Sequence, residues 1–170
     1  GGPTMQDVFS QRISKLGWYP YLAFTSFLVA AERALPRTER GASFELGVAA
    51  GKLGLGTVLK VYVALSSAER LIRSCKLVWQ NYYKDAGRME AIEWQPESTV
   101  LRIYDFPQMH RLHCVLMEAW MISTMESLGF AVGADARQTL FMGDGDPYHE
   151  FRCTWQRKRD AETCSFQAPR

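Results

Sequence analysis

Three side chains near the start of a long apolar segment have the types and spacing to do chemistry together. His110, His113 and Cys114 stand at i, i+3 and i+4, so a helix would turn all three toward one side. Imidazoles and thiolates ligate zinc and haem iron, and when buried without a metal they need hydrogen-bond partners. The spacing leaves three alternatives open: a metal or tetrapyrrole ligand set, polar contacts to an organic ligand, or ordinary buried side chains.

A second polar group lies on a predicted strand near the end of the chain. The returning strand of a hairpin would carry, on one face, His149, Phe151, Cys153 and Trp155. Glycine and proline at 145–147 indicate the turn, because glycine accepts a positive φ and proline fixes its own. His149 is therefore a further candidate haem ligand, and with Cys153 it could join the helical residues in a rebuilt His/Cys metal site.

Aromatic rings and thioethers recur in the pattern that small-molecule pockets use, although each one alone could simply pack the core. This set comprises Trp18, Phe24, Phe27, Trp79, Tyr104, Phe106, Met109, Met117, Trp120, Met121, Met125, Phe141 and Trp155. We predict a cavity whose ligand is held by the long helix and the final hairpin. The predicted ligand contacts are His110, His113, Cys114, Met117, Trp120, Phe141, His149, Trp79 and Tyr104.

The elements that must position these residues follow from hydrophobic periodicity and turn residues. Helical spacing in the first half predicts helices over 8–16, 21–35, 43–53, 57–65 and 67–79. Later segments predict a hairpin of 88–94 with 99–104, a helix over 109–128, and a second hairpin of 131–141 with 148–155. The order helices-β-β-α-β-β predicts an α+β domain in which an N-terminal helical layer packs on a four-stranded antiparallel sheet.

The element order and the final turn resemble the 4-vinyl-reductase domain family, part of a ligand-binding superfamily shared with nitric-oxide-signalling and Golgi-transport proteins. The family pattern ends close to Glu-x-x-Cys-x-x-x-Gly-Asp-Pro-Tyr-Cys-x-Phe, and the similarity covers roughly residues 88–155. The matching residues are Gly145, Asp146, Pro147, Tyr148 and Phe151. The resemblance implies a cavity for a small hydrophobic or aromatic ligand between the helices and the sheet.

The same resemblance bears on metal binding. Where family members often place Glu, Cys and Cys, this chain has Gln138, Phe141 and His149, and the cysteine early in the helix corresponds to Cys114. Two remaining ligands do not make a four-coordinate zinc site. We predict no resident cofactor, with zinc, or haem ligated by His110, His113 or His149, as the alternatives.

We predict a sensor or carrier that binds a hydrophobic or aromatic small molecule and is regulatory and not catalytic. An enzyme is the alternative. Residues 137–152 also resemble the end of the 2-amino-thiazoline-4-carboxylate hydrolase family, which usually has Cys and Asp where this chain has His149 and Glu150. That resemblance implies a thiolate-imidazole pair of Cys114 with His110 or His113, acting on a small heterocyclic or amide substrate. Asp105 or Glu118 would have to supply the carboxylate that orients the imidazole of this pair. A protein-interaction scaffold is the third class.

Composition and charge exclude some partners. The chain has 170 residues, of which 47% are apolar and 22% charged, as in ordinary globular domains. A net charge of +2 and a pI near 8.4 argue against a nucleic-acid partner. The stretch 20–31 is too short for the ~20 apolar residues of a membrane span. Four widely spaced cysteines without a Cys-x-x-Cys pair or a leader favour reduced thiols and a cytoplasmic location.

Domain limits and oligomeric state complete the expectations. We interpret residues 1–4 as a tag remnant, 5–156 as a single ligand-binding domain and 157–170 as a flexible tail. Small residues recur at helical spacing at Ala42, Gly47, Ala50 and Gly51. They predict close packing between helices, but they could equally form a self-association face, and we predict a homodimer. The glycines at 143 and 145 suit a turn, since the calcium-loop ligand spacing is missing.

Overall fold

The computed structural model describes Ser10 and residues 17–36, 38–53, 68–127, 129 and 131–157. The expected tag remnant, the helices at 8–16 and 57–65 and all but the first residue of the expected tail lie outside these residues. The helices are α2 (Tyr21–Ala34), α3 (Ala42–Leu53), α5 (Ala68–Arg73), α6 (Cys75–Tyr82) and α7 (Arg111–Ser127). The strands are β1 (Arg88–Gln95), β2 (Ser98–Tyr104), β3 (Ala131–Leu140) and β4 (His149–Arg157), with a 3₁₀ turn η1 (Met142–Asp144) before β4.

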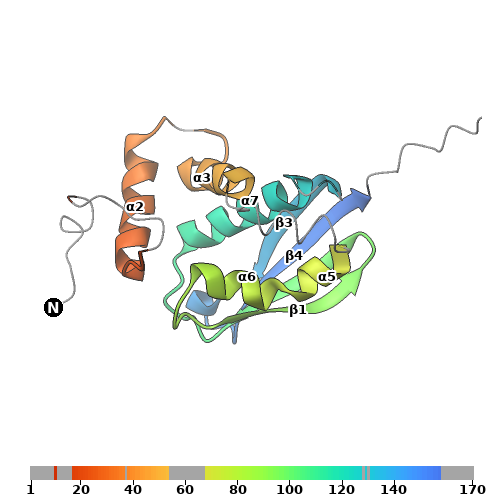
Figure 1. The fold of residues 1–170 in the computed structure, drawn as a ribbon. Coiled ribbons are helices and arrows are strands. Elements are labelled where there is room, and N and C mark those ends of the chain that lie inside the picture. The colour runs from red at the N-terminus through yellow and green to blue at the C-terminus, as the bar shows by residue number, and fades with distance from the viewer. Residues whose placement is uncertain are drawn as a thin grey trace, which may run out of the picture.

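The four strands form one antiparallel sheet in the order β1-β2-β4-β3, so the α+β prediction and both hairpins are confirmed. Helices α5 and α6 contact β1, α7 contacts β3 and β4, and α3 lies against α7 (Figure 1). None of the described helices is long and apolar enough to cross a membrane.

The structure has two helices where the sequence predicts one. The segment 67–79 breaks at Ser74 into α5 and α6. The Ser74 hydroxyl donates to the carbonyl oxygen of Arg70 at 2.8 Å, a local bond that competes with the regular backbone ladder and bends helices. Helical periodicity continues across this position, which is why the pattern alone predicts a single helix.

Helix α3 begins with a cap supplied from α2. The Glu32 carboxylate accepts the backbone N–H of Ser43 at 2.7 Å and that of Ala42 at 3.2 Å, two of the N–H groups that a helix start leaves without an internal partner. The Ser43 N–H bond is the main reason that the pKa of Glu32 is lowered. Gly41, at a φ of 84°, makes the turn that brings the two helices together.

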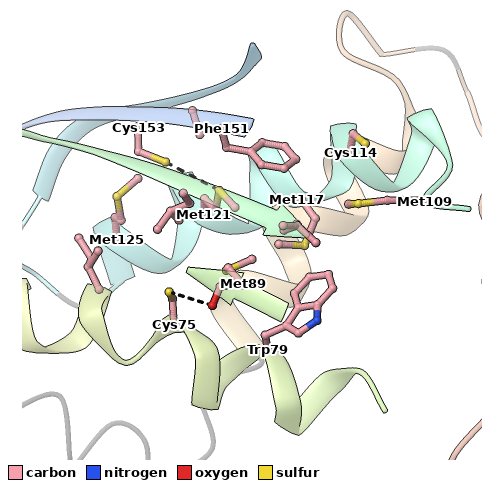
Figure 2. Packing of buried hydrophobic residues seen from close by; sticks show 14 of the residues in the cluster. Cys75, Trp79, Met89, Met109, Cys114, Met117, Met121, Met125, Phe151 and Cys153 are labelled. Atoms are coloured by element: carbon pink, nitrogen blue, oxygen red, sulfur yellow. Dashed lines mark hydrogen bonds between the residues drawn. The ribbon is translucent and has the colours of Figure 1, made fainter. Parts of the chain in front are cut away.

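The face alternation predicted for the last strand is confirmed for its apolar side. Phe151, Cys153 and His149 are almost fully buried, and Phe151 and Cys153 face α7 across the core (Figure 2). Glu150, expected on the open face, is also buried at 8% exposure. Arg102 Nε donates to its carboxylate at 2.8 Å and Thr139 Oγ1 to its other oxygen at 2.8 Å, so the charge is compensated where it lies.

The core between the sheet, α6 and α7 is rich in sulfur, as Figure 2 shows. Cys75 Sγ donates to the Met89 carbonyl at 3.7 Å, and Cys153 Sγ lies 3.8 Å from the sulfur of Met121. Met thioethers fill irregular space without needing partners. The three cysteines of the described chain are buried free thiols: Cys75, Cys114 and Cys153.

Two glycines let α3 approach the outer side of α7. A Cβ on Gly47 would lie 2.3 Å from the Leu116 carbonyl oxygen, and one on Gly51 would lie 2.8 Å from the Ser123 Cβ. Ser123 Oγ also donates to the Val48 carbonyl at 2.9 Å. The small-residue face is thus used for packing within the chain, so it gives no support to a homodimer. The homodimer itself stays a prediction.

We expect Gly47→Ala to lower the free energy of unfolding by about 1–3 kcal/mol, because the added methyl meets backbone that cannot rotate away. Urea unfolding would measure this. Ala49→Ser, at an exposed position of the same helix, is the matched control and should change little. A Gly47→Ala protein as stable as the parent would mean that α3 can move off α7 at no cost.

Candidate functional site

An apolar cavity of about 600 Å³ opens between α3, α6 and α7. Its volume falls within the range of small-molecule sites, about 300–1,000 Å³. None of the described residues that line it carries a charge. They are Phe24, Ala50, Leu53, Val78, Trp79, Tyr82, Tyr83, Met89, Leu116, Met117 and Trp120.

The aromatic walls of this cavity are fixed by their own contacts. Trp79 is buried, its indole N–H donates to the Ala86 carbonyl at 3.0 Å, and its ring stacks on Tyr83 with centroids 4.0 Å apart. Tyr82 of α6 meets Trp120 of α7 edge to face at 6.0 Å. Rings held in this way form a cavity before any ligand arrives, which lowers the entropic cost of binding.

Behind the cavity a buried histidine joins three helical segments. His113 is fully buried on α7; its Nδ1 lies 2.9 Å from the Tyr21 hydroxyl and its Nε2 lies 2.6 Å from the Tyr83 hydroxyl. The Tyr21 hydroxyl also accepts the backbone N–H of His110 at 2.9 Å. Burial lowers the pKa of His113 to about 3, so the imidazole is neutral at physiological pH and one ring nitrogen carries a proton.

A second cavity of about 700 Å³ adjoins the first. The two share Phe24, Tyr82 and Tyr83 among their lining residues. The second is more polar, since Lys84 and Asp85 line it together with Trp18, Tyr19 and Tyr21 at the start of α2. The shared residues therefore separate an apolar space from a polar one.

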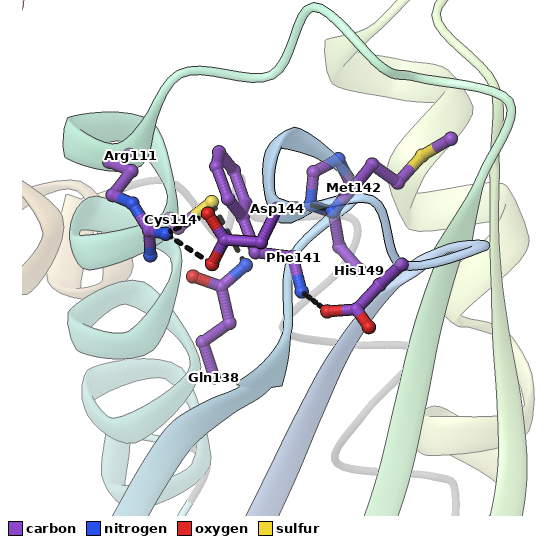
Figure 3. A network of polar contacts seen from close by, with 8 residues as sticks. Arg111, Cys114, Gln138, Phe141, Met142, Asp144 and His149 are labelled. Carbon is purple, nitrogen blue, oxygen red and sulfur yellow. Dashed lines mark hydrogen bonds and ion pairs between the residues drawn. The ribbon is translucent and has the colours of Figure 1, made fainter.

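A polar network lies at the first turn of α7, where the final hairpin turns (Figure 3). Gln138 Nε2 donates to Cys114 Sγ at 3.3 Å, and the rings of Phe141 and His149 lie 5.2 Å apart. The positions that the family resemblance pairs with metal ligands thus lie in this one network. Arg111 covers the Phe141 ring at 4.3 Å and pairs with Asp144 of the turn.

The described residues do not gather as a zinc site, and neither His113 nor His149 has a nitrogen left to ligate a haem iron. His149 Nε2 donates to the Phe106 carbonyl at 3.0 Å while its Nδ1 accepts the Met142 N–H at 3.4 Å, and both nitrogens of His113 are bonded to tyrosines. A ligating imidazole needs one nitrogen for the metal. Within the described ranges no three His, Cys, Asp or Glu side chains gather as a metal set.

The thiolate-imidazole pair of the hydrolase alternative is not formed. Burial raises the pKa of the Cys114 thiol to about 12, where nucleophilic cysteines have theirs lowered. Its sulfur accepts from an amide, while His113 bonds the two tyrosines. Glu118 accepts the Gln138 N–H at 2.7 Å and exposed Asp105 pairs with Arg88, so neither carboxylate orients an imidazole.

The nine predicted ligand contacts divide into four groups. Trp79, Met117 and Trp120 line the apolar cavity, and His113 lies behind its wall. The network of Figure 3 holds Cys114, Phe141 and His149. His110 is exposed before α7, where its Nδ1 accepts the Leu112 N–H at 3.1 Å. Tyr104 packs on Tyr148 and lies under Arg88.

The predicted position of the cavity was wrong in one respect. The long helix lines it, but the opposite walls come from α3 and α6 and not from the final hairpin. Phe27, expected among the wall residues, is 39% exposed. Tyr21, Tyr82 and Tyr83 were not among the predicted wall residues, although Tyr83 stands four residues after Trp79, a spacing at which rings meet along a helix.

The sequence matches no described protein family, and no curated protein matches it. Solved structures of other proteins, in contrast, are similar to this chain in fold. An H-NOX protein from S. oneidensis in the Fe(II) ligation state is 13% identical, with a TM-score of 0.66 over 88% of this chain and 81% of the other. An H-NOX protein mutant from K. algicida, Fe(II) unliganded, is 11% identical, with a TM-score of 0.58 over 91% and 87%.

The chain is similar in fold to H-NOX proteins. A trafficking protein particle complex subunit 3 from Naegleria fowleri, covalently bound to palmitic acid, reaches a TM-score of only 0.49 at 10% identity over 80% of this chain and 84% of the other. At such identities the likeness concerns the fold alone. The iron in the S. oneidensis and K. algicida proteins belongs to them, and in this chain the ring nitrogens of His113 and His149 are bonded to tyrosines and to backbone groups.

We expect stability to depend on His113 below neutral pH. Because its folded-state pKa lies below the unfolded value of about 6.5, its contribution is complete above that pH and is lost as the pH falls toward 3, by about 1.4 kcal/mol per unit. His113→Gln removes this titration and should flatten the loss measured by urea unfolding between pH 7 and 4. Some dependence of stability on pH should remain in the variant, because the pKa of His149 is also lowered. An unchanged slope in the variant would contradict the buried neutral imidazole.

Proposed function

We propose that this chain is a small-molecule-binding module, a sensor or carrier, that holds a hydrophobic or aromatic ligand in the cavity between α3, α6 and α7. The observation that carries the proposal is an uncharged cavity of about 600 Å³ with walls of fixed rings and thioethers. Burying an apolar ligand there is favourable by about 25 cal/mol per Å² of apolar surface. The role is regulatory and not catalytic, because the thiols and imidazoles of the described chain form no activated pair.

The fold comparison and the sequence resemblance support this proposal without fixing its details. A ligand-binding role is what the 4-vinyl-reductase resemblance implies, and we propose that the chain is a divergent relative of that family. The turn at 145–147 is kept while the metal positions hold an amide, a phenyl ring and an imidazole. A cytoplasmic location and a homodimer remain predictions of the same kind.

The test is binding of a plain aromatic hydrocarbon, 2-ethylnaphthalene, followed by tryptophan fluorescence. Trp79 and Trp120 line the cavity, so their emission should change with saturation at one site. Val78→Phe fills the cavity from α6 and should weaken binding about tenfold or more, since the ligand loses about 1.4 kcal/mol or more of contact. Leu77→Phe, an exposed neighbour on the same helix, is the matched control and should bind normally.

Native mass spectrometry and metal analysis on the same protein complete the test. A retained organic molecule without stoichiometric iron or zinc would support the proposal. If Leu77→Phe and Val78→Phe weakened binding equally, the ligand would not lie in this cavity. No saturable binding of either this hydrocarbon or its 2-acetyl analogue to the parent protein would refute the proposed function.

A further inference from the structure

The hydrogen bonds around His113 leave one proton without an acceptor. A neutral imidazole brings one N–H, Tyr21 and Tyr83 bring one O–H each, and the backbone of His110 brings its N–H. These four protons meet only three contacts: His110 N–H to Tyr21, Tyr21 with Nδ1, and Tyr83 with Nε2. One phenolic proton is therefore in excess.

The contacts of Tyr21 indicate that the excess proton is on Tyr83. Because the Tyr21 oxygen already accepts the His110 N–H, its own proton is directed to Nδ1, and the imidazole proton on Nε2 then goes to the Tyr83 oxygen. In the opposite tautomer, with the imidazole proton on Nδ1, the Tyr21 oxygen would accept two hydrogen bonds and the Tyr21 proton would have no acceptor. In the favoured arrangement the Tyr83 hydroxyl accepts from His113 and has its own proton to give. No acceptor for that proton is found among the described residues.

The position of Tyr83 makes this proton available to a ligand. Tyr83 lines both cavities, and its ring is held by stacking on Trp79 while His113 fixes its oxygen. A donor that is already positioned binds an acceptor without first losing conformational freedom. A donor left unpaired in a desolvated place costs free energy, so the cavity disfavours a ligand that offers no acceptor.

The charges around the apolar cavity set the class of acceptor. The described lining residues of that cavity include no cation, and Lys84 lines only the polar neighbour. A carboxylate moved into uncharged surroundings loses its hydration without a counter-charge. An uncharged oxygen, in contrast, gains the hydrogen bond at small desolvation cost.

We infer that the Tyr83 hydroxyl is the residue that orients the ligand, and that the ligand is an uncharged, largely apolar molecule with one acceptor oxygen of the carbonyl type. This inference rests on the proposed function and gives it a substrate class. The site discriminates between ligands because a carbonyl oxygen accepts the Tyr83 hydroxyl proton, whereas a hydrocarbon leaves that proton without a partner.

A matched pair of probes tests the inference: 2-acetylnaphthalene and 2-ethylnaphthalene, which share the naphthalene ring and a two-carbon side chain and differ in the carbonyl oxygen. In Tyr83→Phe the dissociation constant for the ketone should rise about three- to tenfold, the effect of one hydrogen bond, while that for the hydrocarbon stays the same or falls. Tyr104→Phe, which removes a hydroxyl from a tyrosine outside both cavities, is the control and should leave the ratio of the two constants unchanged. At neutral pH, 2-naphthoate should bind more weakly than the ketone.

A spectroscopic measurement separates hydrogen bonding from a merely structural role of the ring. The carbonyl stretch of ¹³C-labelled 2-acetylnaphthalene should move to lower frequency in the parent protein and return toward its dry-solvent value in Tyr83→Phe. If the variant does not fold, the parent spectrum decides alone: a carbonyl at its dry-solvent frequency overturns the inference.

The outcomes distinguish the two proposals. Binding of both probes with a ratio that Tyr83→Phe does not change, or tighter binding of the naphthoate, overturns the inference and leaves the proposed function standing. Failure of both probes to bind the parent protein removes the proposed function and the inference together. A selective loss for the ketone, with the matching spectral shift, supports both.

Discussion

One neutral, buried imidazole connects the parts of the chain that surround the candidate site. His113 comes from α7, while the two hydroxyls that it bonds come from the first residue of α2 and from the residue after α6. The imidazole stays uncharged because it is buried and because each nitrogen faces a phenol, and not a carboxylate that would compensate a positive charge. The separation of the three helices, and hence the width of the space between them, follows from a set of short polar contacts that an apolar interface would not fix.

The same constraint explains why the histidines and thiols of the described core form neither a metal set nor a thiolate-imidazole pair. A histidine with both nitrogens bonded to phenols has none for a metal, and His149 uses its two nitrogens on backbone groups. The thiol of Cys114 is buried beside an amide, which disfavours the thiolate. Residue types that look reactive in the sequence are thus used as structural hydrogen-bonding groups, and the surface left for a ligand is apolar.

Much of the fold could be predicted from local signals. The two hairpins have clear turn residues, and the glycines at 47 and 51 correctly indicate close helix packing. The break at Ser74 could not be predicted, because a side-chain bond to the preceding turn leaves the hydrophobic period unchanged. Glu150 alternates as an exposed strand residue should, and only Arg102 and Thr139, distant in sequence, make its burial possible.

The candidate site was less predictable, because its polar part depends on contacts between distant residues. Trp79, Met117 and Trp120 could be predicted as wall residues from ring and thioether content. Nothing in the sequence near Tyr83 indicates that its hydroxyl meets His113, 30 positions later, or that Tyr21 meets the same ring from 92 positions before. The aromatic spacing could at most have added Tyr83 to the wall, as a ring without a known partner.

The cavity also differs from the core in what holds it open. Trp79, Met89 and Met117 belong to the continuous core and line the cavity at the same time, so the two share a boundary. A space bordered by core residues would normally collapse by rotamer change, since protein interiors are close-packed. Here Trp79 is tied through its indole N–H to Ala86, and Tyr83 is tied through its hydroxyl to His113. Polar bonds at the far ends of aromatic side chains thus prevent the rings from filling the space, which is how a sequence rich in rings can leave room for another molecule.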